Sequence, residues 1–166
     1  MSRIEINQLH ARGFASVMEI IRDAVQDMEA RGIHQWDEIY PGREIISTDI
    51  AAGSLYGLWL EDILAGIIVL NEDQSSEYQT VAWQDNGRPL VMHRLCIKPA
   101  FQRQGLARML VLFAEEFARK HQYTSIRLDA FEHNPDALRL YDSMQYQRRS
   151  LVTFRKGPFY CYEKVL

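Results

Sequence analysis

The stretch Leu95-Cys-Ile-Lys-Pro-Ala-Phe-Gln-Arg-Gln-Gly-Leu-Ala107 indicates a strand that turns directly into a helix. Its apolar start continues a run that begins near residue 90, and Pro99 ends the strand because proline has no backbone N–H to donate. The pattern Gln102-x-x-Gly105-x-Ala107 then opens an amphipathic helix. We therefore expect a strand at 90–97, a tight turn and a helix from about 104 to 120.

The start of this helix has the features of an anion cradle. The first N–H groups of a helix have no partners within it and lie at the positive end of its dipole. Gly105 and Ala107 have little or no side chain, so a ligand could approach the backbone closely, and Arg103 and Arg108 add positive charge. Such a turn can hold a pyrophosphate, which points to a phosphorylated cofactor. Alternatively, Gly105 simply permits a tight turn.

Two common phosphate-binding fingerprints are missing from the sequence. It contains no Gly-x-Gly-x-x-Gly after an early strand, which excludes the usual dinucleotide motif. It also contains no Gly-x-x-x-x-Gly-Lys-Ser/Thr, so the nucleoside-triphosphate loop is excluded as well.

A second motif, Asn134-Pro-Asp-Ala-Leu-Arg-Leu-Tyr141, follows about thirty residues later, and its Asn-Pro-Asp start predicts a helix capped by Asn134. Together, the two segments resemble the GNAT superfamily of acetyl-CoA-dependent N-acetyltransferases, most specifically over residues 91–146. The resemblance implies that the first turn binds the CoA pyrophosphate, and that the later helix binds the pantetheine arm and supplies a tyrosine near the sulfur. The family usually continues Leu-Gly-Phe, whereas this chain has Met144-Gln145-Tyr146 and so lacks the glycine.

The resemblance implies acetyl-CoA as the co-substrate and assigns its binding residues. Backbone groups of the strand end are expected to contact pantetheine, and one N–H there could polarise the acetyl carbonyl. The expected cofactor-binding residues are Leu95, Cys96, Ile97, Gln102, Arg103, Gln104, Gly105, Leu106, Ala107, Arg108, Asn134, Ala137 and Tyr141.

Length and composition predict one globular domain over residues 1–166. The 166 residues are 47% hydrophobic and 25% charged, and the net charge of −3 argues against nucleic-acid binding. No apolar run is long enough to span a membrane, and the N-terminus lacks a signal-peptide core. The two cysteines lie far apart without metal-ligand spacing, so we expect no metal site and a cytoplasmic enzyme.

The order of elements predicts an α+β fold of three layers around a mixed, mostly antiparallel sheet, which the resemblance identifies as GNAT-like. Apolar residues at helical spacing predict a first helix that ends near Gly32. The central strand–helix–strand unit should be a parallel, right-handed crossover. Expected strands cover 3–9, 54–61, 63–71, 90–97, 125–131 and a terminal pair within 146–166; expected helices also cover 43–52 and 135–144.

The helix from 104 to 120 should bury one side. We expect its buried stripe to consist of Leu106, Met109, Leu110, Phe113 and Phe117.

Three residues are candidates for proton transfer. Tyr141 matches the family tyrosine and could return a proton to the departing thiolate, although it also belongs to an apolar helical stripe. Asp129 lies where some family members carry a carboxylate base, and it could equally face solvent. His93 is the rival base because its ordinary pKa lies near neutrality, but a strand histidine often serves packing. A base that consists of water alone is a further alternative.

Acceptor recognition is expected from aromatic residues outside the cofactor motifs. The candidate pocket residues are Trp36, Tyr40, Trp83 and Tyr160, each of which could instead pack in the core. Acidic residues of the polar 72–88 segment would favour a cationic amine, or would simply be solvated: Glu72, Asp73, Glu77 and Asp85.

We therefore predict acetyl transfer from acetyl-CoA to a primary amine, most simply that of a small molecule. The alternatives are a protein N-terminal or lysine acetyltransferase and a non-catalytic acyl-CoA-binding module. Expected partners are the amine alone, with no nucleic acid and no membrane, and the chain would act as a monomer or homodimer.

Overall fold

The computed structural model describes residues 2–166 and contains a mixed seven-stranded sheet in the order β1-β2-β3-β4-β5-β7-β6. This α+β arrangement confirms the predicted fold class. The elements are β1 (Ile4–Gln8), α1 (Phe14–Ala30), α2 (Arg43–Ala51), β2 (Leu55–Leu60), β3 (Ile63–Asn71), β4 (Pro89–Ile97), α3 (Leu106–Lys120), β5 (Ser125–Phe131), α4 (Pro135–Ser143), β6 (Gln147–Phe154) and β7 (Gly157–Val165).

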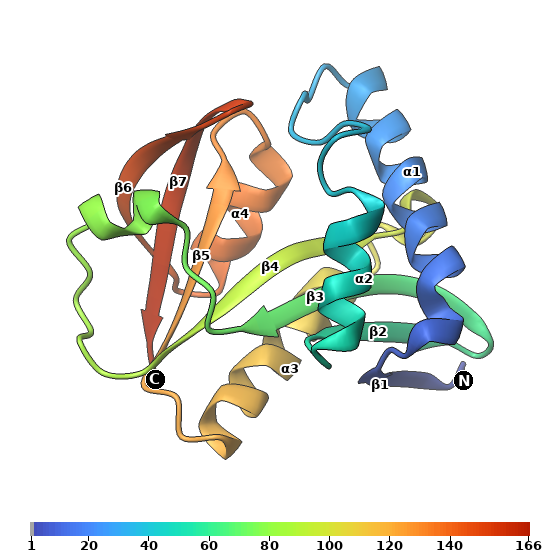
Figure 1. The fold of residues 1–166 in the computed structure, drawn as a ribbon, viewed down its shortest axis with the longest axis horizontal. Helices are drawn as coiled ribbons and strands as arrows, with labels where there is room; N and C mark the ends of the chain where they lie inside the picture. Colours follow the sequence, from blue (N-terminus) through green and yellow to red (C-terminus); the bar gives the residue numbers. More distant parts are fainter. Residues whose placement is uncertain (1) are drawn as a thin grey trace. The chain divides into compact units, whose positions relative to one another are not determined.

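The chain forms two compact units, of which the first contains residues up to Leu70 together with Arg94–Phe113. Within it, β2 pairs antiparallel with both β1 and β3, and β2 and β3 form a hairpin around Glu61 and Asp62. Helices α1 and α2 pack against each other, as Figure 1 shows. The hairpin turn leaves Glu61 at a positive φ of 53°.

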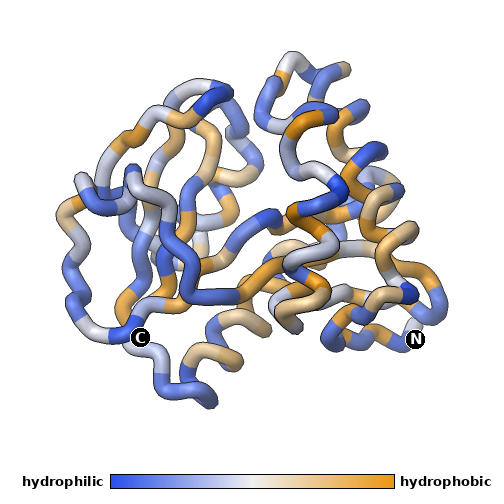
Figure 2. Tube along the Cα trace, viewed as in Figure 1, coloured by the Kyte–Doolittle hydropathy of each residue, from blue (hydrophilic) through white to orange (hydrophobic). Residues whose placement is uncertain are grey.

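The periodicity of α1 explains its position in this unit. Figure 2 shows hydrophobic and hydrophilic residues alternating along the helix. An apolar residue recurs every three or four positions, so one side of the helix is apolar and packs inward. The buried residues of α1 are Val17, Ile20, Ile21, Ala24 and Met28.

The second unit comprises Asn71–His93 and Ala114–Leu166. Its β4 and β5 strands pair in parallel at three positions, from Pro89 opposite Ser125 to Val91 opposite Arg127. Strand β5 pairs antiparallel with β7 on its other side, and β7 pairs with β6. Helix α4 packs against β5. The parallel pairing confirms that the predicted crossover is parallel, and its right-handedness stays a prediction.

Two details of α3 correct the expectations. The helix begins at Leu106 and not near residue 104. Gln104 and Gly105 belong to the turn that precedes it. The predicted stripe was right for Leu106 and Leu110, which are buried, but wrong for Met109, Phe113 and Phe117, which are only partly buried. Three smaller side chains that the prediction left out are buried beside the two leucines: Val111, Ala114 and Ala118.

Gln145 occupies the position where the family usually has glycine. Helix α4 ends at Ser143, and Gln145 follows with a φ of 68° in the left-handed region. An L-residue pays a steric penalty there, which is why glycine is common just past the end of a helix. This chain therefore keeps the backbone turn without the residue that favours it.

None of the helices within residues 2–166 is long and apolar enough to cross a membrane.

Replacing Gln145 by glycine should increase the free energy of unfolding by about 0.5–1 kcal/mol, because relief of left-handed strain exceeds the entropic cost of glycine. The matched change Gln147→Gly, in strand β6, should decrease it. Urea unfolding of both variants provides the measurement. A less stable Gln145→Gly variant would contradict this explanation of the helix end.

Candidate functional site

The turn before α3 holds its backbone in a conformation that favours glycine. Arg103 has a φ of 62° and Gly105 a φ of 80°. The carbonyl oxygen of Gly105 accepts the N–H of Met109 at 3.1 Å, so the helical hydrogen bonds begin at this residue. The N–H groups that follow Gly105 therefore form the free first turn of a 15-residue helix.

The space beside Gly105 is open. A Cβ atom built on this glycine would have no heavy atom of another part of the chain within 4 Å, and residues Arg103, Gln104 and Gly105 are all exposed. A ligand can therefore reach the backbone. Exposed N–H groups beside the arginines Arg103 and Arg108 fit a pyrophosphate, which needs close donors and positive charge. The contact of this turn with the phosphates of CoA stays a prediction.

The end of β4 is fixed to its surroundings in the first unit. The side-chain amide of Gln102 donates to the carbonyl oxygen of Ile97 at 3.3 Å, and the N–H of Lys98 donates to Ala65 at 2.7 Å. Burial raises the pKa of the Cys96 thiol to about 12. Cys96 is therefore a neutral thiol near neutral pH, which argues against nucleophilic chemistry at this residue.

Arg94 forms an ion pair that sequence reasoning missed. Its φ of 53° is unusual within a strand, and its guanidinium makes two hydrogen bonds of 2.8 Å to the buried carboxylate of Asp49 on α2. A third donor reaches the hydroxyl oxygen of Tyr40 at 3.0 Å. No periodic signal links residues 45 positions apart, so only the fold reveals this network.

Tyr141 is buried in the second unit. Its ring contacts Tyr146 and Tyr162 at centroid distances of 5.9 and 5.6 Å, and the side chain is 6% exposed. Burial raises the pKa of Tyr141 well above its ordinary value, and the nearby charge of Asp129 raises it further. Tyr141 therefore remains a protonated donor across the physiological pH range.

Asn134 begins α4 as the sequence predicted. Its side-chain oxygen accepts the N–H of Ala137 at 3.3 Å, and Pro135 occupies the first helical position. This confirms the capping role, in which a side chain satisfies a free helix donor. The contact of Asn134 and Ala137 with pantetheine stays a prediction.

The two candidate bases both have hydrogen-bond partners in the second unit. Asp129 accepts a short hydrogen bond of 2.6 Å from the hydroxyl of Tyr78. The Nε2 atom of His93 lies 2.7 Å from Oδ1 of Asn71, which also accepts the N–H of Asp73. An amide oxygen only accepts, so the Nε2 atom of His93 carries a hydrogen.

The four candidate pocket residues have different environments. Trp36 is buried in the first unit. In the same unit, the hydroxyl oxygen of Tyr40 accepts a hydrogen bond from Arg94. In the second unit, Trp83 lies between Tyr78 and Arg127, and the guanidinium of Arg148 lies 4.6 Å above the ring of Tyr160. Their contact with an acceptor stays a prediction.

The sequence-predicted site residues fall into two groups. The first unit holds the turn from Gln102 to Arg108 and the strand end Leu95–Ile97. The second unit brings together Tyr141 and Asp129, whose charge acts on the Tyr141 hydroxyl, and also contains His93. Among residues 2–166, no three histidine, cysteine, aspartate or glutamate side chains are grouped as a metal site requires.

Comparison with known proteins identifies the family to which the chain is similar. The model of the acetyltransferase (GNAT) family matches residues 16–146. The chain is similar to the N-acetyltransferase YesJ of Bacillus subtilis (strain 168), with 26% identity over 155 residues, covering 85% of this chain and 86% of the relative. It is also 25% identical to an N-acetyltransferase of Lactobacillus delbrueckii subsp. lactis over 164 residues, covering 95% and 92%.

Solved structures share the fold. A GNAT-family acetyltransferase from Streptococcus agalactiae superposes with a TM-score of 0.86 at 24% identity, covering 98% of this chain and 95% of that chain. The PaiA N-acetyltransferase of Thermoplasma acidophilum, solved in complex with coenzyme A, gives 0.78 at 18% identity, covering 99% of each. Acetyl-CoA as co-substrate fits this family.

Replacing Gly105 by valine should abolish measurable CoA binding, because a β-branched side chain resists a positive φ and blocks the approach to the backbone. The matched control is Gly32→Val, since Gly32 also has a positive φ of 74° and open space around it. Titration calorimetry with CoA should give micromolar affinity for the wild type and the control. Unchanged CoA binding by Gly105→Val would show that the turn before α3 does not bind the pyrophosphate.

Proposed function

This chain belongs to the GNAT acetyltransferase family, and we propose that it transfers the acetyl group of acetyl-CoA to the primary amine of a small molecule. The single observation that carries the cofactor half of this proposal is the open, left-handed turn at Gly105. We further propose that residues 1–166 act as one catalytic domain in the cytoplasm, as a monomer or homodimer.

The proposed cofactor contacts use mainly backbone. In this assignment the N–H groups from Arg103 to Arg108 hold the pyrophosphate, and Leu95, Cys96 and Ile97 offer backbone groups to pantetheine. Asn134 and Ala137 at the start of α4 are also proposed as pantetheine-binding residues. Bound acetyl-CoA supplies the activated acetyl thioester. A backbone N–H at the end of β4 would polarise its carbonyl and so stabilise the developing negative charge.

We propose that the hydroxyl of Tyr141 donates a hydrogen bond to the departing sulfur. Its buried phenol keeps its proton because burial and Asp129 raise its pKa. An acid with a pKa far above that of a thiol transfers its proton only partly, so stabilisation of the thiolate through a hydrogen bond is the main expected contribution. The aromatic ring also packs, and a phenylalanine at this position would separate the two roles.

Asp129 is the favoured proton acceptor for the amine, directly or through water. Its charge reaches the Tyr141 hydroxyl, so the acceptor and the donor act in one region of the second unit. His93 remains the rival. Because the Nε2 of His93 carries a hydrogen toward Asn71, only the Nδ1 of that ring could accept a proton from the amine.

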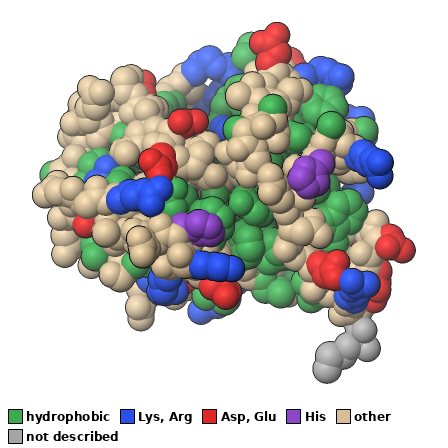
Figure 3. Space-filling view, turned by 60° about the horizontal axis from the view of Figure 1, so that its bottom comes forward, with side chains coloured by type: hydrophobic (Ala, Val, Ile, Leu, Met, Phe, Trp, Pro, Cys, Tyr) green, Lys and Arg blue, Asp and Glu red, His purple; other side chains and the backbone are tan. Residues whose placement is uncertain are grey.

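The acidic residues of the 72–88 segment give less support for recognition of a cation than the sequence suggested. Glu72 pairs with Arg88 at 2.7 Å, and Asp85 accepts hydrogen bonds from Thr124 and Ser125. Asp129 is consequently the acid that we propose for attracting a positively charged amine. Figure 3 shows acidic and basic side chains interspersed over the face in view, in keeping with the proposal that nucleic acid is not a partner.

The acceptor class can be tested with purified wild-type protein. Release of free thiol from acetyl-CoA is measured with a panel of small primary amines and, in parallel, with lysine-containing and N-terminal peptides. We expect turnover with at least one small amine and none with the peptides. Turnover with peptides alone would replace the small-molecule proposal, and CoA binding without any turnover would indicate a non-catalytic module.

Replacing Tyr141 by phenylalanine should lower kcat by ~10²-fold, because the change preserves packing and removes only the hydrogen donor. The melting temperature and the affinity for CoA should change little. The matched variant Tyr123→Phe removes a tyrosine hydroxyl that bonds Glu72 and should keep full activity. Equal kcat in Tyr141→Phe and the wild type would return Tyr141 to a packing role.

Replacing Asp129 by asparagine should lower kcat/KM more than replacing His93 by glutamine. The ordinary pKa values of about 3.9 for aspartate and 6.5 for histidine place their acid limbs at different pH. We expect the pH profile of His93→Gln to retain the acid limb of the wild type. If His93→Gln loses the acid limb and Asp129→Asn keeps a nearly normal kcat/KM, the base is His93.

A further inference from the structure

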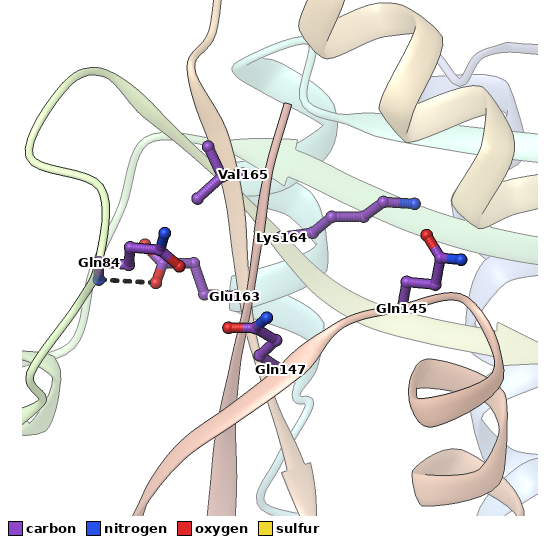
Figure 4. Close-up of a pocket in the computed structure, with 6 residues that line it drawn as sticks. All are labelled: Gln84, Gln145, Gln147, Glu163, Lys164 and Val165. Carbon is purple, nitrogen blue, oxygen red and sulfur yellow. Dashed lines mark hydrogen bonds between the residues drawn. The ribbon is translucent and has the colours of Figure 1, made fainter.

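The polar segment 72–88 between β3 and β4 is anchored to the rest of the second unit. The carboxylate of Glu163 on β7 accepts the backbone N–H groups of Gln84 and Asp85 at 2.8 and 3.0 Å. Figure 4 shows Glu163 reaching Gln84, beside a polar recess lined also by Lys164. Because the side chain of Glu163 is buried, these charge-assisted bonds are shielded from water and hold this part of the segment in place.

Arg127 of β5 provides a second anchor. Its guanidinium lies 4.3 Å above the ring of Trp83, and its nitrogens donate to the side chain of Gln74 at 2.9 Å and to the carbonyl of Asp85 at 2.7 Å. From β6, Arg149 donates to the carbonyl of Ala82 at 2.8 Å. The neighbouring strands β5, β7 and β6 thus each hold part of the segment 72–88.

This anchoring fixes Tyr78, which lies in the short helical turn Ser76–Thr80. The Tyr78 ring contacts Trp83 at 5.2 Å, and the indole N–H of Trp83 donates to the Tyr78 carbonyl at 3.0 Å. The Tyr78 side chain is 3% exposed. Its hydroxyl nevertheless reaches 51 residues along the chain to donate to Oδ2 of Asp129 at 2.6 Å.

Asp129 lies among groups that respond to its charge. It is paired in register with Cys161 of β7, where burial and then the charge of Asp129 raise the pKa of the thiol to about 12. The same charge acts on Tyr141 of α4. The Asp129 carboxylate thus interacts with Tyr78, Tyr141 and Cys161, and Arg127, two positions earlier on β5, interacts in turn with Tyr78.

We propose that Tyr78 is a positioning residue that orients the Asp129 carboxylate and holds it in the ionised form for the acceptor amine. This inference rests on the proposed function of Asp129. A neutral donor suits the task because it stabilises the carboxylate without cancelling its charge, which an arginine would do. The anchored segment explains how a loop residue holds a fixed position.

The test combines a conservative variant with a double-mutant cycle. Tyr78→Phe keeps the ring and removes the hydroxyl, and Tyr123→Phe is the matched control because its hydroxyl donates to the Glu72 carboxylate at 2.8 Å. We expect Tyr78→Phe to lower kcat/KM about tenfold and to move the acid limb to higher pH, since losing the donor raises the pKa of Asp129. In an Asp129→Asn background the same change should have no further effect on kcat/KM.

An NMR titration of the Asp129 carboxyl carbon separates this inference from the proposed function. It should report a higher pKa in Tyr78→Phe than in the wild type, whether or not an acceptor amine is found. An unchanged carboxyl titration, or an equal loss of activity in the Asp129→Asn background, would overturn the positioning role. Thermal melts confirm that each variant is folded, and absence of turnover in the wild type would refute the proposed function alone.

Discussion

The left-handed turn at Gly105 is the constraint from which the cofactor proposal follows. A positive φ at this residue turns the chain into α3 after the short helical turn Pro99–Phe101, and it leaves the first N–H groups of the helix free. Any larger side chain would add backbone strain and also occupy the open space beside the turn. One residue thus provides both the fold connection and the access that a phosphate group requires.

The second unit carries a different kind of chemistry, based on buried tyrosines around one carboxylate. Tyr78 donates to Asp129, whereas Tyr141 is affected by its charge. Burial keeps the Tyr141 phenol protonated, and the Tyr78 hydroxyl donates its hydrogen, so Asp129 is the group among them that can accept a proton. The anchored 72–88 segment matters in this account because it brings Tyr78 to β5.

Local patterns predicted most of the fold. The apolar period of α1, the cap at Asn134 and the strand at Ser125–Phe131 are each set by neighbouring residues, and the structure confirms them. The stripe of α3 was misjudged because aromatic residues were assumed to be buried, while small aliphatic residues pack inward. The bonds of Asp49 with Arg94 and of Tyr78 with Asp129 join distant residues, and no local pattern in one sequence encodes such contacts.

Backbone amide NMR with CoA and with pantetheine, which lacks the pyrophosphate, tests the central claim most directly. If the turn before α3 binds the pyrophosphate, CoA should shift the amide resonances of residues 103–108, and pantetheine should leave them nearly unchanged. Equal shifts of these resonances with both compounds, or no shift with CoA at saturation, would contradict the account.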